Sequence, residues 1–148
     1  GEHLGEGQLN DPDDKSPRFT PVASGCCVLF SIDIFNTVGC FDPLFFVYAE
    51  DTDLFIRMLR KGKKLLYHPG IVLAHKISLS TGGPQSDFSV YYYHRNQIYL
   101  IRKHLGVFWM PLQLLIIIGK AFVRLLLGMD TLRLFGLRMK GVVDGFRV

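Results

Sequence analysis

The chain has 148 residues, of which 49% are hydrophobic and 20% charged, and its formal net charge is +4. This length is typical of one domain with a single core, since domains have roughly 100–200 residues. The high apolar content and small net charge exclude a disordered chain. Three cysteines, two of them adjacent, exclude a disulfide scaffold and favour a reducing compartment. The polar start lacks the pattern of a secretory signal peptide and an initiator Met, and we expect a piece of a longer protein.

Charge is distributed unevenly along the chain. Residues 1–93 have eight basic and eleven acidic side chains, a net charge of −3, whereas residues 94–148 have nine basic and two acidic ones, a net charge of +7. The basic part is also the apolar part. This combination favours a membrane surface as partner. It excludes nucleic acid as a partner, because nucleic-acid binders carry their Lys and Arg on solvated faces.

Hydrophobic periodicity, caps and turn residues predict alternating strands and helices before the tail. In chain order we expect an irregular lead-in over residues 1–21, a buried strand Val22–Phe30, a helix from the N-cap Ser31 to Gly39, an aromatic turn Phe41–Tyr48, a helix Thr52–Lys61 closed by Gly62, short strands Lys64–Tyr67 and Ile71–His75, a polar loop Lys76–Asp87 and a helix from about Ser89 to His104.

The tail, residues 105–148, predicts two amphipathic helices. Residues 111–127 are apolar nearly all round, but Lys120 and Arg124 interrupt them on one face. Each central Lys or Arg costs about 2.5–3.5 kcal/mol in a spanning helix. A second helix is expected over 131–140, with Asp130 as its cap. We expect both helices to lie in the plane of a membrane surface. A spanning helix, a soluble core and an oligomer interface are the alternatives.

Three carboxylates, Glu50, Asp51 and Asp53, occupy four positions at the start of a predicted helix. Acids there are stabilised by the helix dipole, and Asp51 as an N-cap would explain one of them. The other two lie beside it, behind an expected aromatic shell of Phe41, Phe45, Phe46 and Tyr48. A carboxylate at the mouth of an apolar pocket is suited to act as a general base. Both interpretations stay open from the residues alone.

His75 begins a second group of candidate residues. A lone His after an apolar strand is commonly a core or surface residue, but here a loop rich in hydrogen-bond donors follows it, with Ser78, Ser80, Gly82 and Gly83. Such a loop suits phosphate oxygens, and a neutral imidazole can bind a divalent cation, for which Mg²⁺ or Mn²⁺ fits better than zinc.

Arg95 and Asn96 lie inside the helix expected from Ser89 to His104. They could bind an anionic group of a substrate, or they could tie the helix to its neighbours.

Taken together, these motifs resemble the C-terminal half of the catalytic domain of family 2 glycosyltransferases, in the rhamnosyltransferase-like branch. The resemblance covers about residues 20–104. The matching positions are Gly25, Gly39, Phe41-Asp42, Phe45-Phe46, Tyr48, Glu50-Asp51, Asp53-Leu54, Arg57, Gly62, Pro69, His75, Ser80, Gly82-Gly83 and Tyr93-His94-Arg95-Asn96.

The resemblance implies a GT-A fold and sugar transfer with inversion at the anomeric carbon. It implies these roles: Asp51 as general base, Glu50 and Asp53 orienting the base and the acceptor, His75 as ligand of Mg²⁺ or Mn²⁺, Ser78, Ser80, Gly82 and Gly83 binding the donor diphosphate, and Tyr48, Arg95 and Asn96 binding the acceptor or supporting the structure. The donor would be a nucleotide sugar and the acceptor a lipid-linked or polysaccharide hydroxyl.

One departure from the family pattern is large. The family's N-terminal half, which carries the nucleotide-binding first strand and an Asp-x-Asp metal motif, has no counterpart here. We therefore expect an α/β chain, a partial GT-A domain without its nucleotide-binding half, followed by amphipathic helices. Its domains would be a lead-in (1–21), the acceptor-side half (22–104) and a membrane-associating tail (105–148).

The sequence thus predicts a fragment of an inverting glycosyltransferase of cell-envelope polysaccharide or glycolipid synthesis. We expect it to bind peripherally at the cytoplasmic face of the cell membrane and to be inactive as the isolated chain. An oligomer is compatible with the sequence. The first alternative is a non-catalytic remnant that binds a membrane or a partner. A metal-dependent hydrolase using Asp51 and His75 ranks last, because the further ligands of such a site are missing.

Overall fold

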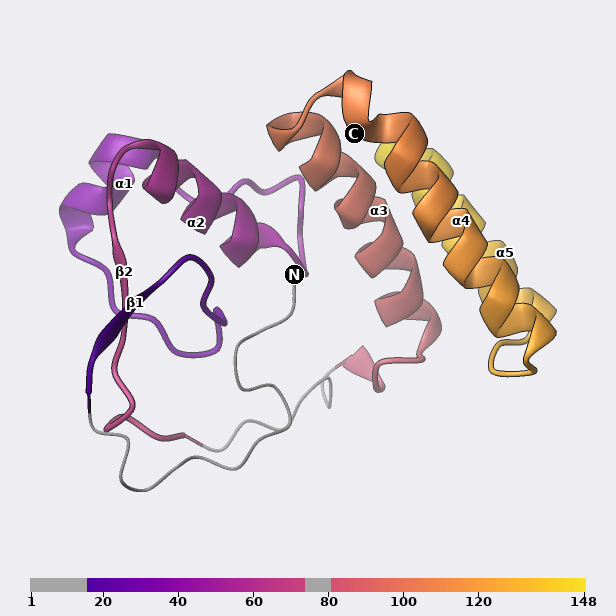
Figure 1. The fold of residues 1–148 in the computed structure, drawn as a ribbon, viewed down its shortest axis with the longest axis horizontal. Coiled ribbons are helices and arrows are strands. Elements are labelled where there is room, and N and C mark those ends of the chain that lie inside the picture. The colour runs from indigo at the N-terminus through magenta and orange to yellow at the C-terminus, as the bar shows by residue number, and fades with distance from the viewer. Residues whose placement is uncertain (1–15, 74–80) are drawn as a thin grey trace. The chain divides into compact units, whose positions relative to one another are not determined.

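The computed structural model describes residues 16–73 and 81–148. The chain divides into two compact units that interleave in sequence (Figure 1). The first unit consists of residues 1–43 and 50–75, and the second of residues 44–49 and 76–148. The described residues are mixed α and β, as expected, although the strands are few and short.

The first unit contains β1 (Arg18–Thr20), α1 (Ile32–Val38), α2 (Glu50–Arg60) and β2 (Leu65–Tyr67). β1 and β2 pair antiparallel, with Phe19 opposite Leu66. β1 lies within the segment that we expected to be irregular.

Both helices of the first unit confirm the sequence prediction, with α2 beginning two residues earlier than expected. α1 starts after Ser31 and ends at Gly39, whose φ of +80° places it in the left-handed region that glycine adopts without steric cost.

The core of the first unit lies between α2 and α1. Leu54, Phe55 and Met58 of α2 are buried with Leu65, and side chains of α1 pack against them. These three residues form the buried apolar face of α2, whereas the neighbouring Leu59 is exposed.

The predicted buried strand Val22–Phe30 is wrong. These residues form an irregular segment with a turn at Gly25 and Cys26, and Leu29 is almost fully exposed. Their polar groups bond locally or to a side chain: the amide N–H of Cys26 donates to Oγ of Ser24, and that of Gly25 to Asp51. Residues 71–73, expected in a second short strand, are also irregular, because a turn from His68 to Ile71 follows β2.

The second unit contains three long helices, α3 (Asp87–His104), α4 (Met110–Leu126) and α5 (Leu132–Gly145), and a short 3-10 helix, Val107–Trp109. Figure 1 shows α4 and α5 side by side. The predicted helices are confirmed, although α5 runs five residues beyond the expected end. Its N-cap is Thr131, whose hydroxyl accepts from the amide of Leu134, and not Asp130 as expected.

Glycines bring α3 and α5 into close contact. A Cβ atom on Gly141 would lie 2.6 Å from the carbonyl oxygen of Tyr91, and one on Gly145 would lie 2.5 Å from that of Arg95. Beside this contact an apolar core joins the three helices through Ile98, Ile101, Met110, Ile117 and Val142.

A buried carboxylate explains why Asp130 is not a cap. Asp130 accepts hydrogen bonds from Arg124 at 3.2 Å and from Nε of Arg138 at 2.8 Å. Burial alone would raise the pKa of Asp130, but the two guanidinium groups outweigh this and hold it below its ordinary value. Arg138 is buried beside Asp130, whereas Arg124 reaches the same carboxylate from a partly exposed position.

His94 completes this buried group. Its Nδ1 bonds to the carbonyl of Val90 at 2.8 Å, and its Nε2 lies 3.1 Å from Nη1 of Arg138. An arginine can only donate, so Nε2 accepts and the imidazole is neutral. Burial lowers the pKa of His94, and the charge of Arg138 lowers it further.

Candidate functional site

Asp51 lies in the first turn of α2 and accepts hydrogen bonds at both carboxylate oxygens. The amide N–H of Gly25 donates to Oδ2 at 2.8 Å, and the amide N–H and hydroxyl of Thr52 donate to Oδ1 at 2.6 and 3.2 Å. A helix N-terminus stabilises the charged form, and each carboxylate oxygen has more than one lone pair. Asp51 is therefore held in place and still able to accept a proton.

Gly25 is required for this arrangement. A Cβ atom at position 25 would lie 2.7 Å from Oδ2 of Asp51, closer than such contacts occur in proteins. The group that approaches the Gly25 backbone this closely is the Asp51 carboxylate. Because α2 begins at Glu50, Asp51 is inside the helix and is not its N-cap.

Glu50 is half-buried and lacks a full set of hydrogen bonds. Within the described residues its Oε2 atom is buried without a hydrogen-bond partner. Burial raises the pKa of Glu50, and the charge of Asp51 adds to this, against a backbone hydrogen bond that lowers it. A half-buried carboxyl group with a raised pKa beside a second carboxyl group is typical of sites that exchange protons.

Asp53 differs from its two acidic neighbours. Its side chain is fully buried and paired with Arg57, at 2.8 Å to Nη2 and 2.9 Å to Nε. Arg57 also donates to the carbonyls of Val38, Gly39 and Cys40. Asp53 thus fixes α2 to the end of α1. Its expected role in orienting an acceptor stays a prediction.

The turn that leads into α2, residues 44–49, has an unusual backbone. Phe46, Tyr48 and Ala49 all have φ between 62° and 67°, in the left-handed region that residues other than glycine rarely adopt. The side chains of this turn contact different parts of the second unit and do not form one aromatic shell. Phe45 packs on Tyr99 with ring centroids 4.8 Å apart, whereas Phe46 is exposed and faces Tyr92.

Tyr48 joins this turn to the loop before α3. Its hydroxyl lies 3.0 Å from Oγ1 of Thr81 and 2.8 Å from Oγ of Ser89. Thr81 is followed by Gly82 and Gly83, whose φ values of +78° and +95° suit glycine. Their expected diphosphate contacts stay a prediction.

Arg95 and Asn96 both bind the backbone of the same turn. The Nδ2 group of Asn96 lies 2.7, 2.5 and 2.9 Å from the carbonyl oxygens of Phe45, Val47 and Tyr48. Arg95 donates to the carbonyl of Leu44 and to Oδ1 of Asn96, both at 2.9 Å. Of the two alternatives left open by the sequence, these contacts favour the structural one.

The remaining predicted residues, His75, Ser78 and Ser80, lie outside the described residues. Within residues 16–73 and 81–148, no group of three His, Cys, Asp or Glu side chains could hold a metal ion. The site for Mg²⁺ or Mn²⁺ therefore stays a prediction.

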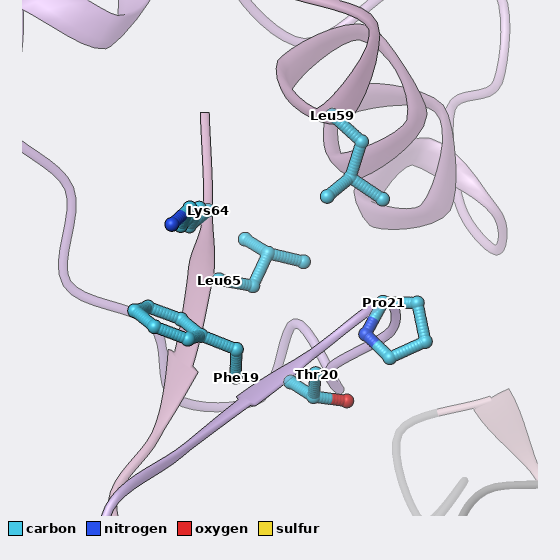
Figure 2. Close-up of a pocket in the computed structure, with 6 residues that line it drawn as sticks. All are labelled: Phe19, Thr20, Pro21, Leu59, Lys64 and Leu65. Atoms are coloured by element: carbon cyan, nitrogen blue, oxygen red, sulfur yellow. The ribbon is translucent and has the colours of Figure 1, made fainter. Parts of the chain in front are cut away.

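A pocket in the first unit contains none of the predicted site residues. It has a volume of about 270 Å³ and a mainly apolar lining, and its residues come from β1, α2 and the start of β2 (Figure 2). Lys64 provides its charged group, and Leu59 closes one side. The pairing of β1 with β2 creates this pocket, which we did not predict because β1 lies in the segment that we expected to be irregular.

Comparison with known proteins finds two matching curated proteins. The chain is 32% identical over 99 residues to N-acetylglucosaminyl-diphospho-decaprenol L-rhamnosyltransferase of Mycobacterium tuberculosis, in the strains CDC 1551 / Oshkosh and H37Rv. The match covers 66% of this chain and 32% of each relative, so the chain spans about a third of their length. No family model and no solved structure matches. The similarity relates the chain to a glycosyltransferase.

Proposed function

We propose that these residues form the acceptor-side part of an inverting glycosyltransferase with a partial GT-A fold. It would transfer a sugar of the rhamnose class from a nucleotide sugar to a hydroxyl of a lipid-linked acceptor, with Asp51 as general base. The observation that carries the proposal is the Asp51 carboxylate, held by three hydrogen bonds at a helix N-terminus, in a chain related to a rhamnosyltransferase.

The proposed reaction assigns proton transfer and positioning to this chain. The acceptor hydroxyl attacks the anomeric carbon, its proton passes to Asp51, and the bond to the nucleoside diphosphate breaks on the opposite face. Glu50, with its raised pKa, would exchange a proton with the same site. His75 is the one residue that we propose as a ligand of Mg²⁺ or Mn²⁺, and no step is assigned to the cation.

The donor site would be completed by residues outside this chain. The sequence contains no counterpart of the nucleotide-binding half, and the curated relatives are about three times the length of the matched segment. We therefore expect the 148 residues alone to bind a nucleotide sugar poorly and not to turn it over. Robust transfer by the isolated chain would refute this part of the proposal.

We further propose that α4 binds the cytoplasmic surface of the cell membrane. Val107–Leu126 is long and apolar enough to cross a bilayer, and 17% of its apolar 18-residue window is buried. The large exposed side chains of this segment include Leu115, Phe122 and Leu126. Four basic residues of the tail, Arg124, Arg138, Lys140 and Arg147, form ion pairs with Asp130 and Asp144, two with each acid, so a net positive charge remains.

Asp51→Asn tests the catalytic proposal in the full-length natural protein. Loss of a general base lowers kcat by about 10²–10⁴-fold, with donor binding unchanged. Asp33→Asn, the same substitution at an exposed position of α1, is the control and should transfer normally. Normal transfer by Asp51→Asn would refute the assignment of the base.

Vesicle binding tests the membrane proposal and the alternative of a non-catalytic remnant. Leu115→Asp should weaken binding to anionic vesicles, whereas Leu29→Asp, at an exposed position of the first unit, should not. Binding that depends on Leu115, in a full-length protein that transfers no sugar, would favour the remnant. Equal binding by both variants would refute a membrane role for α4.

A further inference from the structure

The turn 44–49 needs support from outside its own sequence. Phe46, Tyr48 and Ala49 adopt left-handed backbone conformations although none is a glycine. Such conformations persist where the surrounding structure determines them, and they gather at functional sites. Within the turn, one backbone hydrogen bond is described, from the amide of Val47 to the carbonyl of Phe45.

Asn96 provides that support. Its side chain is fully buried, and its Nδ2 group lies within 2.9 Å of three carbonyl oxygens of the turn. An amide has two N–H donors, so one of them is shared between two carbonyls. Its Oδ1 atom accepts from Arg95, whose other Nη group binds the carbonyl of Leu44. Both ends of the Asn96 amide are therefore occupied by the protein itself.

This occupancy decides between the two roles that the sequence left open. A side chain that binds an acceptor must have a free donor or acceptor at the surface, and the amide of Asn96 is buried and saturated. The contacts instead fall on the last residues before α2: Asn96 binds the carbonyl of Tyr48, and Ala49 is joined directly to Glu50. The backbone that Asn96 holds is the backbone from which the chain enters the acidic turn of α2.

We propose that Asn96 is a positioning residue for the acidic cluster of the transfer reaction, acting through the turn 44–49. This inference rests on the proposed function of Asp51. Asparagine is suited to the task because aspartate of the same shape has no N–H donors and would place negative charge against three carbonyl oxygens. Tyr48 supports the same turn from its other side, through Thr81 and Ser89.

Two measurements on Asn96→Asp test the inference. Gln97→Glu is the control, because it adds the same charge at the next position of α3. In the 148-residue chain, hydrogen exchange measured by NMR reports the turn directly. In wild type, the Asn96 side-chain amide and the backbone amide of Val47 should exchange slowly. In Asn96→Asp, exchange at residues 45–51 should accelerate, while the α3 and α5 amides stay protected.

The second measurement is transfer by the full-length protein, normalised to the fraction that binds donor. Misplacing a catalytic group by about 1 Å lowers its rate by about 100-fold. Asn96→Asp should therefore lower kcat on this order and shift the limb of the pH profile that reports the base. KM for the nucleotide sugar should be unchanged, and Gln97→Glu should behave as wild type. A merely structural role would lower the donor-binding fraction and leave the normalised kcat and pH profile as they are.

Each outcome has a defined meaning. Unchanged exchange at residues 45–51 in Asn96→Asp would overturn the claim that Asn96 holds the turn. Faster exchange with normal kcat and pH profile would overturn its positioning role. Absence of transfer by wild type with every nucleotide sugar would overturn the proposed function and with it the positioning role, and the exchange data would still show whether Asn96 holds the turn.

Discussion

The contact between α3 and α5 predicts opposite effects for one substitution at two glycines of the same helix. Gly136 and Gly141 both lie inside α5. A Cβ atom at Gly136 meets no other atom within 4 Å, whereas one at Gly141 would lie 2.6 Å from the carbonyl oxygen of Tyr91 and 3.1 Å from the amide nitrogen of Arg95. The obstacles at Gly141 are backbone atoms, which cannot rotate aside.

The expected magnitudes follow from two terms. Alanine stabilises a helix interior by about 1 kcal/mol relative to glycine, and this gain applies at both positions. At Gly141 the helices must also separate by several tenths of an ångström, and overpacking of this kind costs about 1–3 kcal/mol. With contact to rigid backbone we place the cost near 3 kcal/mol. Gly136→Ala should then stabilise by about 1 kcal/mol and Gly141→Ala should destabilise by about 2 kcal/mol.

Urea unfolding followed by far-ultraviolet circular dichroism measures both effects. The slope of the free energy of unfolding against urea should be the same for wild type and both variants, so that midpoints can be compared directly. A Gly141→Ala midpoint at or above that of wild type would refute the close approach of α3 and α5. A fall in the Gly136→Ala midpoint would show that this glycine has contacts that the structure does not contain.

Four further outcomes are expected. Asp53→Asn should lower the free energy of unfolding by about 1.5–3 kcal/mol, because it removes the charged partner of Arg57. Glu50→Gln should raise the free energy of unfolding at pH 7. Burial raises the pKa of Glu50, so ionisation of this side chain costs the fold stability as pH rises above 4.5, and glutamine does not ionise. Urea midpoints at pH 4 and pH 7 check this pair, and a loss of stability in Glu50→Gln at pH 7 would contradict it. The pKa of His94 is lowered, so the contribution of its neutral imidazole to the free energy of unfolding is complete above pH 6.5, its ordinary pKa, and is lost as pH falls below that value. Urea midpoints of wild type between pH 7.5 and 5 should show this loss. In His94→Gln the midpoint should change less with pH over the same range. Gly25→Ala should displace the Asp51 carboxylate and reduce transfer by the full-length protein while the urea midpoint changes little, whereas unchanged kcat would show that the Gly25 contact is dispensable.

Local signals in the sequence predicted the helices well. Ser31 and Gly39 mark the two ends of α1, and Gly62 follows the end of α2. The apolar spacing of Leu54 and Met58 marks the buried face of α2. Such signals depend only on residues a few positions apart, so they can be read from the sequence without knowledge of the tertiary structure. The strand prediction failed at Val22–Phe30 because small β-prone residues form a strand when a neighbouring strand accepts their hydrogen bonds, and here these bonds go to Ser24 and Asp51.

The candidate site was predicted only in part, because local spacing along the sequence does not report contacts between distant segments. The spacing of Glu50, Asp51 and Asp53 identified the cluster, but periodicity could not separate their environments. Asp53 is buried because Arg57 and the end of α1 lie against it, and Asn96 binds carbonyls some fifty positions earlier in the chain. These contacts join distant segments, and a single sequence carries no direct record of them.

The interleaving of the two units determines where this chain can be cut. A polypeptide that starts at residue 76 would contain α3, α4 and α5 but would lack residues 44–49. The buried amide of Asn96 would then lose all three of its carbonyl partners, and an unpaired buried polar group costs about 1–3 kcal/mol. Expression of the helical unit by itself, and gene fusions that divide the chain near residue 76, would both carry this defect.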